Sequence, residues 1–426
     1  MPMKETRMRW PCLTDPMRRQ LLLASGVGLL PIPRSAGASG WQPPALVVVM
    51  LRGAVDGLSV VIPHADLEYH RVRAEIAIPA PGSAEHAALP LDARFGLHPS
   101  LARLMPWWQS GQLAFVQASG SPDPTRSHFD AQDFMETATP GRRSTPEGWL
   151  NRLLAQGGGE QIRGMNLGTG MPRILSGAAS VGAIAPSPNA ALGGQRPAAR
   201  PRDAAALLPG QALAQLHAAD PASAAAWRAL QQSREAVLQS NIDGMDPGIA
   251  PGALPLTGLS RDAQRLGQLL RTDAGLQVGF LSLGGWDTHV NQGGVRGALA
   301  NRLRLLGDGL DTLAQSLGPR LQNTVILVMS EFGRTVRQNG TQGTDHGHGN
   351  VMWLLGGPVK GGKVHGEWPG LEPSALHEGR DLAITTDFRQ VLLQVLERHM
   401  GVDERGLQAV LPQGAGRTAG IDLFHA

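Results

Sequence analysis

The heptapeptide Ala45-Leu46-Val47-Val48-Val49-Met50-Leu51 is apolar at every position and rich in β-branched valine. A strand with one solvated face alternates apolar and polar residues, so this run predicts a strand buried on both faces, as parallel sheets require. Similar runs recur at Leu113–Ala118, Leu276–Leu283, Thr324–Ser330 and Val351–Leu355.

Helical patterns separate these runs, at Leu101–Gln109, His128–Thr137, Ala263–Arg271, Gly297–Leu317 and Asp387–His399. The alternation predicts a doubly wound α/β fold, with a mostly parallel sheet sandwiched by helices. Residues 177–225 are rich in Ala, Pro and Gly, and a second Gly/Pro-rich stretch ends at residue 258. We therefore expect one α/β domain over residues 39–426, with a helical, flexible insertion at about 177–258.

Residues 1–38 have the features of an export signal. Arg18-Arg19 directly precede the apolar run Leu21–Ile32, and the small residues Ser35–Ala38 follow. This order predicts a twin-arginine signal peptide cleaved after Ala38, with an ordinary Sec signal or a frayed helix as the alternatives. We expect a periplasmic or secreted protein that meets the twin-arginine translocase during export. No later stretch is apolar for long enough to span a bilayer, so no stable membrane insertion is expected after cleavage.

The formal net charge of +3 resides in this leader, which holds six basic and two acidic residues, a net of +4. The remainder carries −1, which gives no indication of nucleic-acid binding. The single cysteine, Cys12, also lies in the leader. The rest of the chain therefore has no disulfide, thiolate metal site or cysteine nucleophile.

Chemically capable side chains follow several predicted strands, at the sheet edge where ligands of α/β proteins bind. They are Asp56, then Arg126, Ser127 and His128, then Asp287 and His289, then Glu331 and Arg334, and finally Asp345, His346 and His348. Converging carboxylates repel one another unless a cation or protons neutralise them, and imidazole with carboxylate suits a divalent metal. Local roles stay open for each: Ser127 as a helix N-cap, Asp56 as a turn residue, Asp287 and His289 as a loop pair, and residues 345–348 as a solvated loop.

The chain resembles the bacterial family known as domain of unknown function 1501 at six places, in family order. They are Leu51–Leu58, Ser127–Gln132, Gly285–His289, Ser330–Thr335, Asp345–Gly347 and Thr386–Arg389. That family looks like a distant branch of the alkaline phosphatase and sulfatase superfamily. The resemblance implies an alkaline-phosphatase-like fold with one or two divalent ions (zinc, manganese, magnesium or calcium). It implies metal ligation by Asp56, Asp287, His289, Glu331, Asp345, His346 and His348.

The resemblance also implies a serine nucleophile, Ser127. If the site is active, we expect His128 to act as a ligand or an acid and Arg126 or Arg334 to clamp the oxyanion with its planar donors, with a solvated surface position as the alternative for Arg126. Phe332 departs from the superfamily, which has a ligating histidine there, so a single metal or an inactive site is an alternative. We expect an exported metal-dependent hydrolase of small anionic esters, phosphate or sulfate. A non-catalytic exported binding or assembly protein is the alternative. The absence of G-x-S-x-G and of G-x-x-x-x-G-K-[ST] argues against a serine esterase of the α/β-hydrolase type and a P-loop NTPase.

Overall fold

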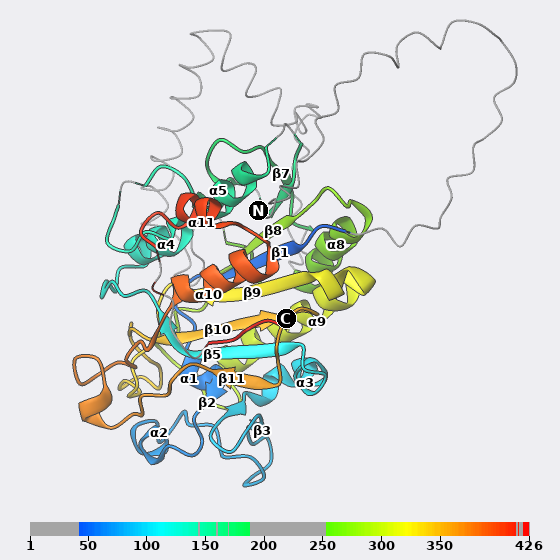
Figure 1. Cartoon of the computed structure of the whole chain (residues 1–426). Coiled ribbons are helices and arrows are strands. Elements are labelled where there is room, and N and C mark those ends of the chain that lie inside the picture. The colour runs from blue at the N-terminus through cyan, green and yellow to red at the C-terminus, as the bar shows by residue number, and fades with distance from the viewer. Residues whose placement is uncertain are drawn as a thin grey trace, which may run out of the picture. The chain divides into compact units, whose positions relative to one another are not determined.

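The run at residues 45–51 is β1 (Ala45–Leu51), which lies between β8 (Val278–Leu283) and β9 (Thr324–Ser330) and is parallel to both (Figure 1). The structure, a computed structural model, describes residues 42–143, 145–158, 161–168, 170–187, 253–414, 416 and 421–425. Across the sheet the order is β11 (Lys363–His365), β5 (Leu113–Gly120), β10 (Asn350–Leu355), β9, β1, β8, β6 (Gly164–Leu167) and β7 (Val181–Ile184), and β12 (Thr386–Asp387) pairs with the end of β5.

One strand of this sheet, β10, runs against its neighbours β5 and β9, and the other pairings are parallel. The prediction of an α/β fold with a large, mostly parallel sheet is thus confirmed. The carboxyl ends of β1, β5, β8 and β9 lie at one edge of the sheet, and the amino end of β10 lies there too. Segments that leave these strands therefore meet at that edge.

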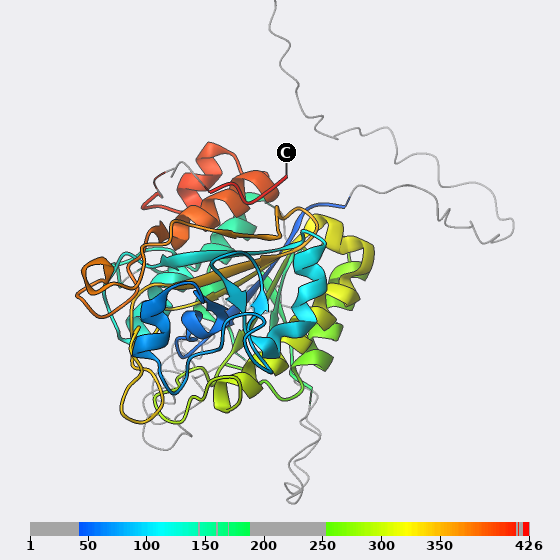
Figure 2. The same ribbon diagram turned by 90° about the horizontal axis from the view of Figure 1, so that it is seen from below.

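The residues of β1 alternate between two hydrophobic cores. Val47, Val49 and Leu51 pack with η2 (Pro99–Leu104), α3 (Met105–Gln109), α8 (Leu259–Thr272) and α9 (Ala298–Leu317). Leu46, Val48 and Met50 pack with α4 (His128–Thr137), α5 (Trp149–Gln156), α10 (Phe388–Gln394) and α11 (Glu404–Val410). Figure 2 shows α10 and α11 on the opposite side of the sheet from α8 and α9. Helices on both faces explain why β1 has no polar residue, since each fully buried aliphatic side chain contributes about 1.5–3 kcal/mol.

The remaining elements are short. A small sheet contains β2 (Val61–Ile62), β4 (Gly96–Leu97) and β3 (Leu89–Pro90) in that order. The other helical segments are α1 (Gly57–Val60), α2 (Leu67–Val72), η3 (Arg173–Leu175), η4 (Gly318–Asn323), η5 (Pro373–Ala375) and η6 (Val395–His399). None of the described helices is long and apolar enough to cross a membrane.

The structure differs from the sequence predictions at one end of the sheet. The insertion was expected to begin at residue 177, but Val181–Ile184 form β7, which pairs with β6 in the main sheet. Neither strand was predicted, because each has four residues that include a glycine and gives no continuous apolar run. Most of the predicted insertion, residues 188–252, and the whole predicted signal peptide lie outside the described residues.

Candidate metal centre

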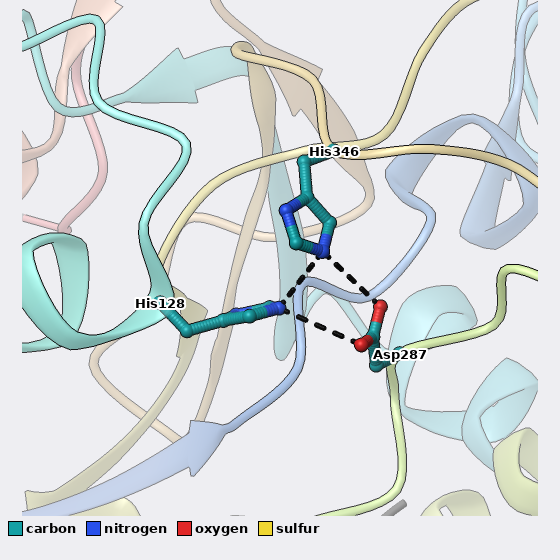
Figure 3. Close-up of side chains that lie close together, drawn as sticks. All are labelled: His128, Asp287 and His346. Carbon is teal, nitrogen blue, oxygen red and sulfur yellow. Dashed lines mark hydrogen bonds and ion pairs between the residues drawn. The ribbon is translucent and has the colours of Figure 1, made fainter. Parts of the chain in front are cut away.

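Three segments that follow different strands bring His128, Asp287 and His346 together (Figure 3). His128 is the first residue of α4, which follows β5; Asp287 follows β8; and His346 lies between β9 and β10. One ligand atom from each residue lies within 4.8 Å of the other two, a spacing that could hold a metal ion. The convergence follows from the topology, because all three segments leave or enter the sheet at the same edge.

A third histidine joins this group. The Nε2 atom of His346 lies 3.0 Å from Nε2 of His128 and 3.0 Å from Nε2 of His289. Asp287 Oδ1 lies 3.0 Å from Nε2 of His289 and 3.3 Å from Nε2 of His346, and its Oδ2 lies 3.7 Å from Nε2 of His128. We call these four residues, His128, Asp287, His289 and His346, the histidine cluster.

Each imidazole points its other nitrogen, Nδ1, at an acceptor of its own. His128 contacts Glu331 Oε1 at 2.8 Å, His289 contacts Asp345 Oδ1 at 2.8 Å, and His346 contacts the backbone carbonyl of Arg126 at 3.0 Å. Because carbonyl and carboxylate oxygens accept, each Nδ1 carries a proton. In a neutral imidazole this leaves the lone pair on Nε2. The arrangement matches the pattern of metal-ligating histidines, which donate the outer N–H to a carboxylate or carbonyl.

The inner nitrogens of the cluster therefore need a positive charge between them. Three Nε2 lone pairs and a carboxylate that face one another repel unless a proton or a cation lies among them. A proton on one ring satisfies one pair of atoms, whereas a metal ion satisfies all of them at once. Three imidazole nitrogens with one carboxylate oxygen make four donors, the number and kind that zinc binds in proteins.

The carboxylates around the cluster are held ionised. Burial would raise the pKa of Asp287, but hydrogen bonds from His128 and His346 and the charge of Arg334 lower it far below its usual range. Burial would likewise raise the pKa of Glu331, but hydrogen bonding to His128 lowers it to about 2. For His128 burial alone would lower the pKa, and the same two carboxylates overcome that effect and raise it to about 9. The cluster thus attracts positive charge.

Arg334 was expected to clamp an oxyanion, and the structure gives its guanidinium other partners. It is buried and donates to four backbone carbonyls, those of Gly53, Ala54, Trp286 and Thr344. It also donates to Asp287 Oδ1. Arg334 therefore holds the segments after β1, β8 and β9 together and orients Asp287. Gly53 is needed in this packing, since its φ is +115° and a Cβ there would lie 2.7 Å from Asp287 N.

Phe332, which directly follows Glu331, is the residue noted above as a departure from the resemblance. Its ring is buried and packs against His128 at a centroid distance of 4.9 Å and against His346 at 5.2 Å. The neighbouring Glu331 was expected to ligate a metal, but its Oε1 accepts from Gly53 N, Gln132 Nε2 and His128 Nδ1. Glu331 orients a cluster histidine, and Phe332 forms an apolar wall beside it.

Asp56 was also expected to be a metal ligand, and the structure does not bring it to the cluster. Arg73 donates to both of its carboxylate oxygens, at 2.6 and 3.0 Å, and Ser59 and Gln292 donate to Oδ2. Asp56 and Arg73 are both 0% exposed. The carboxylate is thus neutralised by a guanidinium of the same chain, which was not predicted from the sequence because Arg73 belongs to no motif.

Three other candidates have different roles. Asp345, expected to ligate a metal, orients His289 instead. His348, also expected to ligate a metal, is buried and stacks on His377 with ring centroids 4.1 Å apart, and burial lowers its pKa to about 4. The Arg126 side chain binds Glu378 and Asp381, so it is not free to clamp an anion.

Ser127 is exposed and is the N-cap of α4, where its hydroxyl accepts from Asp130 N at 3.4 Å. This is the capping role that the sequence left open for it. Gln132, which supports Glu331, was not assigned a role from the sequence. Its position four residues after His128, on the same face of α4, is the signal that could have identified it.

Comparisons with known proteins place the chain in a family. It belongs to the family described as protein of unknown function (DUF1501), which matches residues 44–411. No curated protein matches. Among solved structures, the C-terminal periplasmic domain of EcEptC from Escherichia coli, in complex with Zn, has 12% identity and a TM-score of 0.35, and the match covers 74% of this chain and 73% of that one. Ps i-CgsB in complex with k-i-k-neocarrahexaose has 12% identity and a TM-score of 0.37, over 86% and 74%. Likeness at these scores carries no conclusion about fold or function.

Proposed function

We propose that this protein is an exported metal-dependent hydrolase of phosphate or sulfate esters that holds one divalent cation in the histidine cluster. The observation that carries the proposal is the convergence of three imidazole Nε2 atoms and Asp287. Each imidazole is oriented by a hydrogen bond from its Nδ1 to an oxygen acceptor. Zinc is the ion that best suits three nitrogens and one carboxylate, because magnesium and calcium prefer oxygen ligands. The leader, with Arg18-Arg19 before an apolar run, supports export by the twin-arginine route.

The cation would polarise the ester and lower the pKa of a bound hydroxyl group or water. His128, His346 and Asp287 would hold it, and His289 would complete the donor set. His289 and Asp345 form the more open side of the cluster, with side chains 38% and 53% exposed. A small anionic ester would enter from that side, since the opposite side is closed by Phe332 and Glu331.

Ser127 is the proposed nucleophile. Its hydroxyl is exposed, it precedes His128 directly, and it caps α4, whose first-turn N–H groups favour a nearby anion. Attack by Ser127 would form a covalent phosphoryl or sulfuryl serine and release the alcohol, and water would then cleave the serine ester. A distant relation to the alkaline phosphatase and sulfatase superfamily is part of this proposal. It is supported by the sequence motifs and agrees with the mostly parallel sheet.

Elemental analysis of protein purified without chelators tests the metal centre. We expect about one equivalent of zinc or another divalent ion per chain, lost in His346→Ala and kept in His86→Ala, which removes a surface histidine outside the cluster. Turnover of 4-nitrophenyl phosphate and 4-nitrophenyl sulfate is then measured for the wild type, His346→Ala and Ser127→Ala. Loss of turnover in both variants supports the mechanism. Turnover by Ser127→Ala alone would assign the attack to water, and turnover by both would refute the proposal.

The exposed apolar side chains favour a second candidate, a non-catalytic exported protein that binds a partner at the cluster. The large apolar side chains that are exposed among the described residues are Leu67, Phe129 and Val290. Two of these, Phe129 and Val290, directly follow the cluster histidines His128 and His289. Metal bound stoichiometrically, with no turnover of either ester, would favour this candidate.

A further inference from the structure

Gln292 lies behind the histidine cluster, in the segment between β8 and α9, and is 0% exposed. Its side-chain oxygen accepts from the hydroxyl of Thr288 at 2.8 Å and from the hydroxyl of Thr344 at 2.7 Å. Its side-chain nitrogen donates to Asp56 Oδ2 at 2.7 Å. The residue is thus the common partner of two threonines and of the buried Asp56 carboxylate.

The two threonines lie within the segments that supply the cluster. Thr288 separates Asp287 from His289, and Thr344 comes two residues before His346. The backbones of the two segments also meet, since Thr344 N donates to Thr288 O at 3.2 Å. One oxygen atom of Gln292 therefore joins two segments that carry three of the four cluster residues.

The orientation of the Gln292 amide is determined by its surroundings. Asp56 Oδ2 accepts hydrogen bonds, so the amide nitrogen must face it and the amide oxygen must face the two hydroxyls. Asp56 is in turn held by Arg73, which also donates to the carbonyls of Val336 and Thr335. Thr288, Thr344, Asp56 and Arg73 are at most 3% exposed. Water does not compete for these bonds, and a buried, satisfied network of this kind is rigid.

We propose that Gln292 is the positioning residue of the metal centre: through Thr288 and Thr344 it sets the separation of Asp287 and His289 from His346. This inference rests on the proposed metal-binding function. Support of a ligand from behind typically accounts for about a 10–100-fold difference in metal affinity. Asp56, expected from the sequence to bind the ion, contributes instead at the far end of this network.

The test compares cobalt(II) binding by the wild type and by Gln292→Leu, well below the unfolding temperature of either protein. The affinity comes from competition with a chelator, and the d–d absorption of bound cobalt reports the geometry of its ligands. We expect at least a tenfold weaker affinity and an altered spectrum. Asn151→Leu is the matched control, since Asn151 is a 1% exposed amide in α5 that bonds to Leu175 O, Ala179 O and Ala179 N. The control should lose stability and keep the wild-type cobalt affinity and spectrum.

If Gln292→Leu does not fold, the same measurement is made on a double variant, Thr288→Val with Thr344→Val. This variant removes the two hydroxyls that bond to Gln292 and keeps the side-chain shape. Cobalt affinity within twofold of wild type, with an unchanged spectrum, in either folded variant would overturn the positioning role alone. A wild-type protein that binds no cobalt and no zinc would overturn the proposed function and this inference together.

Discussion

Asp56 and Asp287 follow neighbouring parallel strands of the same sheet, yet they have different electrostatic surroundings. Asp56 is fully buried, and Arg73, Ser59 and Gln292 supply it with hydrogen-bond donors. Asp287 is a quarter exposed and receives Arg334 on one oxygen, and its carboxylate oxygens lie 3.0–3.7 Å from three imidazole Nε2 atoms. A guanidinium of the chain thus binds both oxygens of the first carboxylate and one oxygen of the second, and in the proposed metal centre a cation from outside would bind the second group.

Under the proposed function, this difference separates the aspartate that would bind the ion from the one that would not. Position in the fold is not sufficient, because both aspartates lie at the ligand-binding edge. The deciding feature is whether a guanidinium of the same chain already satisfies both carboxylate oxygens. For Asp56 it does, and a cation placed there would be repelled by Arg73.

The largest effect on stability is expected from Arg73→Met, which removes the cation of the buried Asp56–Arg73 pair. This change leaves Asp56 charged, buried and without its cation, which costs about 3–5 kcal/mol of the free energy of unfolding. Urea unfolding of the metal-free protein measures it. Arg71→Met is the control, since Arg71 pairs with Glu68 at the surface, where water screens such pairs and they contribute little to stability. Equal losses in the two variants would show that burial of the Asp56–Arg73 pair has no special importance.

The sequence predicted the scaffold better than the roles of its polar residues. β1 was predicted because all seven residues are apolar, and the start of α4 because Ser127 and Asp130 resemble a capping box. β7 was missed because Val181–Ile184 is a partly exposed end strand with a weak apolar pattern. Four of the expected metal-site residues do converge, if His128 is counted as a ligand. The sequence could not separate Asp56 from Asp287, because nothing marks Arg73, seventeen residues further on, as the partner of Asp56.

The second prediction concerns pH and the interior near Asp56. His98 is buried, its Nδ1 accepts from Ser100 N and its Nε2 contacts Gly294 O, so the folded state requires the neutral ring. Burial lowers the pKa of His98 to about 4, below its ordinary value of 6.5. The unfolded chain therefore binds this proton first as pH falls. The contribution of the neutral His98 ring to the free energy of unfolding is therefore fully present above pH 6.5. About 3 kcal/mol of it is lost as the pH falls towards 4.

Urea unfolding of metal-free protein between pH 7 and pH 4 measures this loss. The His98→Asn variant has no titrating ring, so its free energy of unfolding should fall less steeply over that range, although it is lower at neutral pH. Parallel pH profiles for the two proteins would contradict the prediction.

The third prediction is that zinc bound at the histidine cluster raises the free energy of unfolding. Zinc at about 100 times its dissociation constant should raise the free energy of unfolding of the wild type by about 2.7 kcal/mol. His346→Ala should show no zinc-dependent increase, and without metal it should unfold within about 1 kcal/mol of wild type, because His346 is only partly buried. Thermal unfolding with and without zinc measures both. An equal zinc effect in Arg71→Met and His346→Ala would place the zinc elsewhere.

The smallest effect is expected from Glu331→Gln, which tests the carboxylate that orients His128. Gly53 N, Gln132 Nε2 and His128 Nδ1 all donate to Oε1, which an amide oxygen can replace, and the new amide group can donate to Ser330 Oγ in place of Oε2. The change therefore keeps the shape and removes the charge. We expect about tenfold weaker zinc binding, because His128 becomes less basic, with little change in the zinc-free stability. Asp345→Asn should weaken binding less, since Asp345 is half exposed and water screens its charge on His289. Equal effects of the two changes would mean that burial of the orienting carboxylate does not set the strength of the site.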